Sequence, residues 1–309
     1  MTTIEWTEQT WNPTTGCDQI SPGCTNCYAM TMAKRLKGMG SAKYQTDGNP
    51  RTSGPGFGIA VHPEAIREPL RWKKPRLVFV NSMSDLFHSG ISTPDLHLIF
   101  GVMAATPQHT YQVLTKRHGR MRSLINDPQF AHMTRHRAEQ VFGRPATAGW
   151  TWPLPNVHLG VSVENQKWAD IRIKALAQTP AAVRFLSCEP LIGPVRLNRS
   201  HGHCPTHDFS GCFCSGPCPD LILPDWIIIG GESGPGARPF YPQWAADLID
   251  DARQAGAAPF VKQLGTLWAR DFTVNGKTVA AHGDTKGGKP EYWPAKLRVR
   301  EYPKAASDG

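Results

Sequence analysis

Three cysteines lie within eleven positions of TWNPTTGCDQISPGCTNCYAMTMAKRL, residues 10–36. Cys17, Cys24 and Cys27 are spaced C-x6-C-x2-C, and no fourth cysteine or histidine lies nearby in the sequence. A structural zinc ion is bound by four protein ligands. Three thiols must therefore be joined by a ligand from a distant part of the chain, or one coordination position of the metal stays open. A 4Fe-4S cluster held by three thiolates leaves one iron free for an external ligand, whereas electron-transfer clusters ordinarily use four cysteines. The spacing therefore favours an open cluster site.

The residues around these cysteines suit a cluster-binding loop. Pro22-Gly23 predicts a type II turn, whose backbone N–H groups could donate to the sulfurs. A helix is expected to begin around Cys27, capped by Thr25 or Asn26. The positive end of the helix dipole would lower the thiol pKa values and favour an anionic cluster.

A second cysteine group lies in a Cys/His-rich segment, residues 198–220, which we interpret as an insertion. Its four thiols have the spacing C-x7-C-x-C-x3-C; they are Cys204, Cys212, Cys214 and Cys218. Four thiols suit a tetrahedral zinc site that would order a polar segment. A second iron-sulfur cluster can also be bound by four thiols, so the sequence does not distinguish zinc from a cluster at this group.

Alternating strand and helix patterns are expected to position these groups. Short apolar runs, typical of parallel strands buried on both faces, occupy residues 77–80, 111–114, 157–163, 183–186, 226–229 and 259–261. Helical spacing occupies residues 94–106, 165–178 and 242–256. Strand followed by helix, repeated about six times, predicts an α/β fold with a parallel sheet, closed as a (β/α) barrel or open as a partial one.

Each predicted strand ends in charged or amide residues. These are Asn81, Asp85, Lys116, Glu164, Glu189, Glu232 and Lys262. In barrels the active site is assembled from the loops after the carboxyl ends of the strands, so we expect these side chains to point toward one mouth. The catalytic residues stay open, with Asp85, Glu189 and Lys262 as candidates for proton transfer.

A family resemblance follows from these motifs. Trp11-Asn12-Pro13, Thr15-Gly16-Cys17 and Ser21 to Ala29 resemble the signature of a phage and bacterial three-Cys-motif family of unknown function. The blocks NSMSDLFH, VLTKR, LGVSVEN, FLSCEPL, IIIGGESG and FVKQLG also look like that family, so the resemblance covers roughly residues 4 to 268. The three cysteines at a first strand-to-helix junction, before an α/β barrel pattern, resemble the radical S-adenosylmethionine superfamily.

The resemblance implies a barrel of the radical S-adenosylmethionine type with a 4Fe-4S cluster on Cys17, Cys24 and Cys27. It differs from the superfamily in its first cysteine gap, which is six residues here and usually three. Gly230-Gly231-Glu232 has the superfamily's Gly-Gly-Glu sequence but follows a later run, so its methionine-binding role is not transferred; Glu232 stays a cofactor-binding candidate. Residues expected to contact S-adenosylmethionine are Asn81, Ser82 and Asp85 for methionine, and Ser162, Glu164 and Asn165 for ribose and adenine.

By the same resemblance, the reduced cluster would cleave S-adenosylmethionine to a 5′-deoxyadenosyl radical, with an electron donor such as a flavodoxin or ferredoxin as partner. The substrate is unknown; a nucleobase, nucleoside or nucleic acid is the expectation. The alternative from another class is a noncatalytic, zinc-stabilised nucleic-acid-binding protein.

The composition agrees with a polyanionic partner. The chain has 309 residues, a formal charge of +9 and a pI near 9.2, and basic excess raises affinity for phosphates. No stretch approaches the roughly 18 to 20 apolar residues of a membrane span, so we expect a cytoplasmic protein, in host cytoplasm if phage-encoded. We also expect one α/β domain over residues 1–309, with a disordered tail at 303–309.

Overall fold

The computed structural model describes residues 4–142, 150–197 and 222–303. The second cysteine group and residues 304–309 of the predicted tail lie outside these ranges, so the zinc and second-cluster predictions stay predictions. The chain divides into two compact units: residues 1–160 with 179–182, and residues 161–178 with 183–309. Among the described helices, none is long and apolar enough to cross a membrane.

The strands form an all-parallel main sheet in every pair whose register is defined. Its order is β1-β4-β5-β6-β7-β8-β9, and β1–β4, β4–β5, β7–β8 and β8–β9 are parallel. The order follows the sequence without reversal, as in a (β/α) barrel and unlike a doubly wound sheet. The predicted α/β class is confirmed, and the strand order agrees with a partial barrel.

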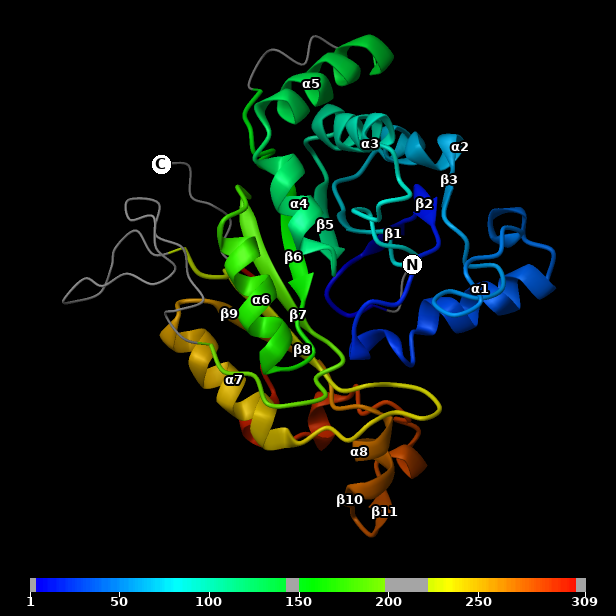
Figure 1. Cartoon of the computed structure of the whole chain (residues 1–309). Helices are drawn as coiled ribbons and strands as arrows, with labels where there is room; N and C mark the ends of the chain where they lie inside the picture. Colours follow the sequence, from blue (N-terminus) through cyan, green and yellow to red (C-terminus); the bar gives the residue numbers. More distant parts are fainter. Residues whose placement is uncertain (1–3, 143–149, 198–221, 304–309) are drawn as a thin grey trace. The chain divides into compact units, whose positions relative to one another are not determined.

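The first unit contains the cysteine loop. Its strands are β1 (Gln9–Trp11), β2 (Thr14–Thr15), β3 (Ala60–Val61), β4 (Leu77–Val80), β5 (Thr110–Thr115) and the first part of β6 (Val157–Ser162). Its helices are α1 (Tyr28–Gly38), α2 (Pro63–Ile66), α3 (Thr93–Ala105), α4 (His118–Ile125) and α5 (Pro128–Phe142). β2 and β3 form a separate antiparallel pair, and α5 lies against α3 (Figure 1).

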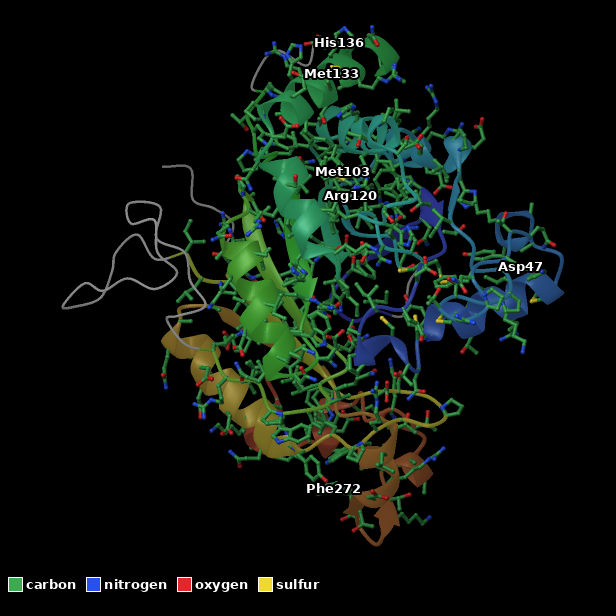
Figure 2. The ribbon with its side chains drawn as sticks, in the orientation of Figure 1. Asp47, Met103, Arg120, Met133, His136 and Phe272 are labelled. Atoms are coloured by element: carbon green, nitrogen blue, oxygen red, sulfur yellow. The ribbon has the colours of Figure 1, made fainter. Side chains whose placement is uncertain are left out.

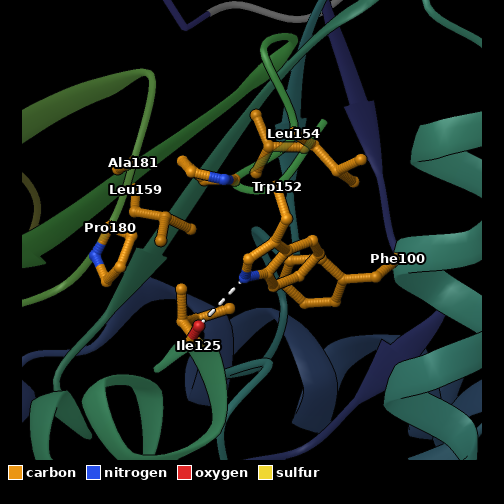
Figure 3. Close-up of a pocket in the computed structure, with 9 residues that line it drawn as sticks. Phe100, Ile125, Trp152, Leu154, Leu159, Pro180 and Ala181 are labelled. Atoms are coloured by element: carbon orange, nitrogen blue, oxygen red, sulfur yellow. Dashed lines mark hydrogen bonds between the residues drawn. The ribbon is translucent and has the colours of Figure 1, made fainter. Parts of the chain in front are cut away.

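An aromatic cluster closes the core of this unit beside α3 and α5. Phe100 of α3 meets Phe130 of α5 edge-on, with ring centroids 5.5 Å apart. Figure 3 shows Trp152 beside Phe100 and donating its indole N–H to the Ile125 carbonyl at 3.0 Å. The surrounding pocket is lined by apolar side chains only. It is therefore part of the hydrophobic core and not a candidate active site.

The second unit carries the later strand ends. Its elements are α6 (Gln166–Ala177), β7 (Val183–Cys188), β8 (Trp226–Gly230), α7 (Pro242–Gln254), β9 (Ala258–Gln263), α8 (Thr266–Asp271), β10 (Thr273–Val274) and β11 (Lys277–Thr278). Every residue of β8 is buried, and α7 packs on β8 and β9. The antiparallel β10–β11 pair lies beside α8, where Phe272 is exposed (Figures 1 and 2).

The apolar runs locate the buried strands closely. The six runs correspond to β4, β5, β6, β7, β8 and β9, and the three helical patterns to α3, α6 and α7. β1 is not among the runs because only Trp11 of its three residues is buried. A continuous apolar run requires burial on both faces, which this strand lacks.

Candidate functional site

The cysteine loop, residues 12–27, follows β1 and runs beside the segment that follows β4, residues 81–88. The Met83 N–H donates to Asn12 Oδ1 at 3.0 Å. In return the Gly16 N–H donates to the Met83 carbonyl at 3.0 Å. Because β1 and β4 are parallel neighbours, their carboxyl ends lie at the same edge of the sheet, and the cysteine loop and residues 81–88 both begin there. The cysteine loop is therefore held by the strand-end residues that the sequence singled out.

Asn81 occupies an unusual position at the end of β4. Its φ is 62°, in the left-handed region that few residues other than glycine adopt, and its side chain is 3% exposed. Asn81 Nδ2 donates to Thr14 Oγ1 at 2.9 Å. Its Oδ1 is buried and meets no hydrogen-bond donor in the described part of the chain. A strained backbone with a buried, unsatisfied acceptor is a combination found at ligand sites.

Ser82, also predicted to contact the cofactor, joins the same edge. Its hydroxyl donates to Asn12 Oδ1 at 3.2 Å. Its carbonyl accepts a hydrogen bond from the hydroxyl of Tyr28, the first residue of α1. These contacts tie the start of α1 to the segment after β4, although Tyr28 itself is 57% exposed.

The three cysteines of the loop lie before α1: Cys27 is the N-cap of the helix, Cys24 ends the turn Pro22–Cys24, and Cys17 lies earlier in the loop. Cys24 is buried, whereas Cys17 and Cys27 are half-buried and pack against the same apolar cluster. That cluster consists of Ala29, Ala33, Tyr44, Phe57 and Met83. In the described ranges, no three His, Cys, Asp or Glu side chains are placed to hold one metal ion.

Two local details of the loop differ from the sequence prediction. Residues Pro22–Cys24 form a 3-10 turn instead of the predicted type II turn. α1 begins at Tyr28 with Cys27 itself as its N-cap residue. The Thr25 hydroxyl, one of the two predicted caps, donates back to the Pro22 carbonyl at 3.0 Å, because the turn brings that oxygen within reach.

Arg117, at the N-cap of α4, connects Cys17 with Asp85. Its Nη1 lies 3.3 Å from Cys17 Sγ and 3.4 Å from Asp85 Oδ2. Burial, and then the charge of Asp85, raises the pKa of the Cys17 thiol to about 12, although Arg117 acts in the opposite direction. Asp85 also accepts from the Thr115 hydroxyl at 2.6 Å and the Lys116 N–H at 2.9 Å. Asp85, a predicted catalytic candidate, thus organises the end of β5.

Asp18 anchors the loop on its other side. Its carboxylate accepts from the hydroxyls of Ser53 and Thr52, which hold the pKa of Asp18 below its usual value. His88 Nε2 lies 3.0 Å from Asp18 Oδ2, and the Gly90 N–H donates to His88 Nδ1. Because Nδ1 accepts from the Gly90 N–H, the ring carries its proton on Nε2 and donates it to Asp18, and burial lowers the pKa of His88.

The excursion at residues 38–58 is held against the cysteine loop. In the sequence this glycine-rich stretch reads as a long loop. Asp47, labelled in Figure 2, pairs with Lys37 of α1 at 2.5 Å and accepts from the Gly56 N–H at 2.7 Å. Together with the bonds from Thr52 and Ser53 to Asp18, these contacts tie the excursion to α1 and to the cysteine loop.

Gly16 allows the excursion to approach the loop closely, and replacing it by alanine is expected to destabilise the first unit. Its φ is 87°, and an added Cβ would lie 2.1 Å from the Gly58 carbonyl oxygen. Left-handed strain costs about 1–2 kcal/mol and the backbone clash adds to it, so we expect a loss of at least about 2 kcal/mol in urea unfolding. Gly40→Ala is the matched control, because Gly40 has a φ of 75° but open space around it. Equal losses in both variants would contradict the close approach.

In the second unit, two of the predicted catalytic candidates form a pair. Glu189 follows β7 and Lys262 lies in β9, and Lys262 Nζ donates to Glu189 Oε1 at 2.7 Å. Gln263 Nε2 lies 3.4 Å from the same oxygen. The side chains of Lys262 and Glu189 are 15% and 20% exposed, so the pair is accessible but largely shielded. Such a pair can hold and transfer a proton.

The other predicted residues of this unit have contacts that build the fold. Glu164 and Arg172 are both 0% exposed and form an ion pair at 2.9 Å. Asn165 is the N-cap of α6, where its side chain accepts from the Trp168 N–H. The Ser162 side chain is buried, and its carbonyl accepts from Arg172 Nη1 at 2.8 Å. Their expected contacts with ribose and adenine stay predictions.

Glu232 is likewise engaged within the second unit. Both of its carboxylate oxygens accept from the Arg238 guanidinium, at 2.6 and 2.9 Å. An added Cβ at Gly231 would lie 2.3 Å from the Leu264 carbonyl oxygen. In this motif, Gly231 therefore allows the backbone to pass close to Leu264, and Glu232 forms an ion pair with Arg238.

The structure brings together the residues predicted from the cysteine loop and from β4. Arg117 links Cys17 to Asp85, and Asn81 and Ser82 bind Thr14 and Asn12 of the cysteine loop; these contacts form a network between the two segments. Sequence reasoning missed Arg117, Asp18 and His88 as members of this network. The only signal for them was their place in polar strand-end or loop segments, which singled out Lys116 instead of Arg117.

The fold and the network define an α/β protein with a parallel sheet in sequence order and a three-cysteine loop after its first strand. The model of a family described as "Protein of unknown function (DUF5131)" matches residues 1–293, and the chain belongs to that family. Comparisons with curated proteins and with solved structures find no match.

Proposed function

We propose that the protein is a radical S-adenosylmethionine enzyme of a phage or prophage type, with a 4Fe-4S cluster on Cys17, Cys24 and Cys27. The observation that carries this proposal is the position of the three-cysteine loop before α1, beside the segment that follows β4, where Asn81 Oδ1 is buried and meets no hydrogen-bond donor among the described residues. A three-cysteine set leaves a metal position open, and the adjacent acceptor gives that position a polar neighbour.

The number of thiols favours a cluster over a single structural ion. A structural zinc site uses four protein ligands, whereas a 4Fe-4S cluster held by three thiolates leaves one iron free for an external ligand.

The chemistry supplied by the cluster would be reductive cleavage of S-adenosylmethionine to a 5′-deoxyadenosyl radical. This chain's residues would bind and orient the cofactor. Asn81 Oδ1 is the acceptor available for the methionine ammonium group, and the Ser82 hydroxyl lies next to it in the chain. Asp85 already accepts several hydrogen bonds, so its part is to hold Arg117.

The substrate and partners follow from charge and chemistry. Among the expected substrates, a nucleobase, a nucleoside or nucleic acid, the formal charge of +9 favours nucleic acid, because basic residues attract its phosphates. Glu189 and Lys262 would hold and move a proton at Glu189 Oε1. A one-electron donor such as a flavodoxin or ferredoxin would supply the reductant.

Anaerobic reconstitution of the full chain with iron and sulfide tests the proposal. We expect a brown protein with about four irons per chain at this site. It should release 5′-deoxyadenosine when S-adenosylmethionine and dithionite are added. A colourless protein that retains zinc and releases no 5′-deoxyadenosine would instead favour the zinc-stabilised nucleic-acid-binding alternative.

A further inference from the structure

We propose that Arg117 sets the reduction potential of the cluster by donating a charged hydrogen bond to the Cys17 sulfur. This inference rests on the proposed function and adds a tuning role for one residue. Arg117 Nη1 lies 3.3 Å from Cys17 Sγ, within the range of a hydrogen bond to sulfur. Cationic donors to a thiolate make stronger hydrogen bonds than neutral ones.

The guanidinium is fixed by partners on several sides. Nη1 also lies 3.4 Å from Asp85 Oδ2, and Nη2 donates to the Asp18 carbonyl at 3.3 Å. The backbone N–H of Arg117 donates to Thr115 Oγ1 at 2.8 Å. The Arg117 side chain is 14% exposed and that of Asp85 is 8% exposed. These partners hold the Arg117 guanidinium in its orientation toward Cys17. The low exposure of the side chain limits the screening of its charge by water.

The three thiols therefore differ in their surroundings. Cys24 Sγ lies 3.8 Å from the neutral Ser21 hydroxyl, with no cationic hydrogen-bond donor to it among the described residues. Cys17 has a cation in direct contact. Because reduction adds negative charge to a cluster and its sulfurs, a cationic donor stabilises the reduced form more than the oxidised one. Arg117 should thus raise the reduction potential and make the cluster easier to reduce.

The test compares reconstituted full-length variants by spectroelectrochemical titration without S-adenosylmethionine. Arg117→Gln removes the cation and should shift the potential to a more negative value. Arg117→Lys keeps the charge but loses the planar fork that reaches Asp85, Cys17 and the Asp18 carbonyl, so its shift should be smaller. Arg122→Gln is the matched control, because Arg122 is an exposed arginine of the same helix and should leave the potential unchanged.

The outcomes separate this inference from the proposed function. If the wild-type chain assembles no cluster, the proposed function fails and the tuning role fails with it. If the cluster assembles and Arg117→Gln keeps the wild-type potential, the tuning role alone is overturned. Should Arg117→Gln not fold, as judged by circular dichroism, Arg117→Lys decides: a more negative potential supports the role, and an unchanged one overturns it.

Discussion

Replacing Cys27 by alanine is expected to abolish cluster assembly and, with it, the release of 5′-deoxyadenosine. Cys27 is the N-cap of α1 but makes no side-chain capping hydrogen bond, so its loss should cost the fold little. A three-thiolate cluster that loses one ligand has two open irons and is not retained. Iron content and S-adenosylmethionine cleavage should fall together to the background of protein-free reagents, while the far-ultraviolet circular dichroism stays that of the wild type.

Cys188→Ala is the matched control for this loss. Cys188 ends β7, is 0% exposed, and its pKa is raised by burial, as expected of a small apolar core residue. Its replacement should lower stability by about 1 kcal/mol and leave iron content and cleavage intact. The assignment of the cluster to the first cysteine group would be wrong if Cys27→Ala kept its iron content and its cleavage of S-adenosylmethionine. It would also be wrong if Cys188→Ala lost them.

Breaking the Glu164–Arg172 pair is expected to be the most costly single change in the second unit. Both side chains are 0% exposed and their charges meet at 2.9 Å. Arg172 also lies over the Trp168 ring, 4.0 Å from its centroid. Glu164→Leu would leave a buried cation without its carboxylate, which typically costs about 3–5 kcal/mol. Urea unfolding of the full chain measures this loss.

A double variant and an exposed pair complete the experiment. Glu164→Leu combined with Arg172→Met removes both charges and should recover most of the lost stability. Lys296→Ala removes one partner of the Lys296–Asp250 pair, whose side chains are 50% and 45% exposed, and should cost at most about 1 kcal/mol. A Glu164→Leu variant with wild-type stability but lost S-adenosylmethionine binding would contradict the structural role and support the cofactor contact that the resemblance implies.

The fold class was accessible from the sequence because of how buried strands are built. A strand covered on both faces must be apolar at nearly every position, and β4 and β8 show this in the runs LVFV and WIII. The helical patterns are equally direct, since α7 keeps its apolar residues on one face. The short strand β1 was not predicted, because three residues with one buried side chain show no hydrophobic periodicity.

The sequence by itself also determined that Cys17, Cys24 and Cys27 belong to one loop, because they are close along the chain. Only the tertiary structure decided what surrounds them. Arg117 reaches Cys17 across a separation of 100 residues, and His88 reaches Asp18 across 70. Contacts of that kind depend on strand register and on the course of each loop, and a one-residue shift in either would replace every partner. The same reason explains why the buried Glu164–Arg172 ion pair could not be predicted from the sequence.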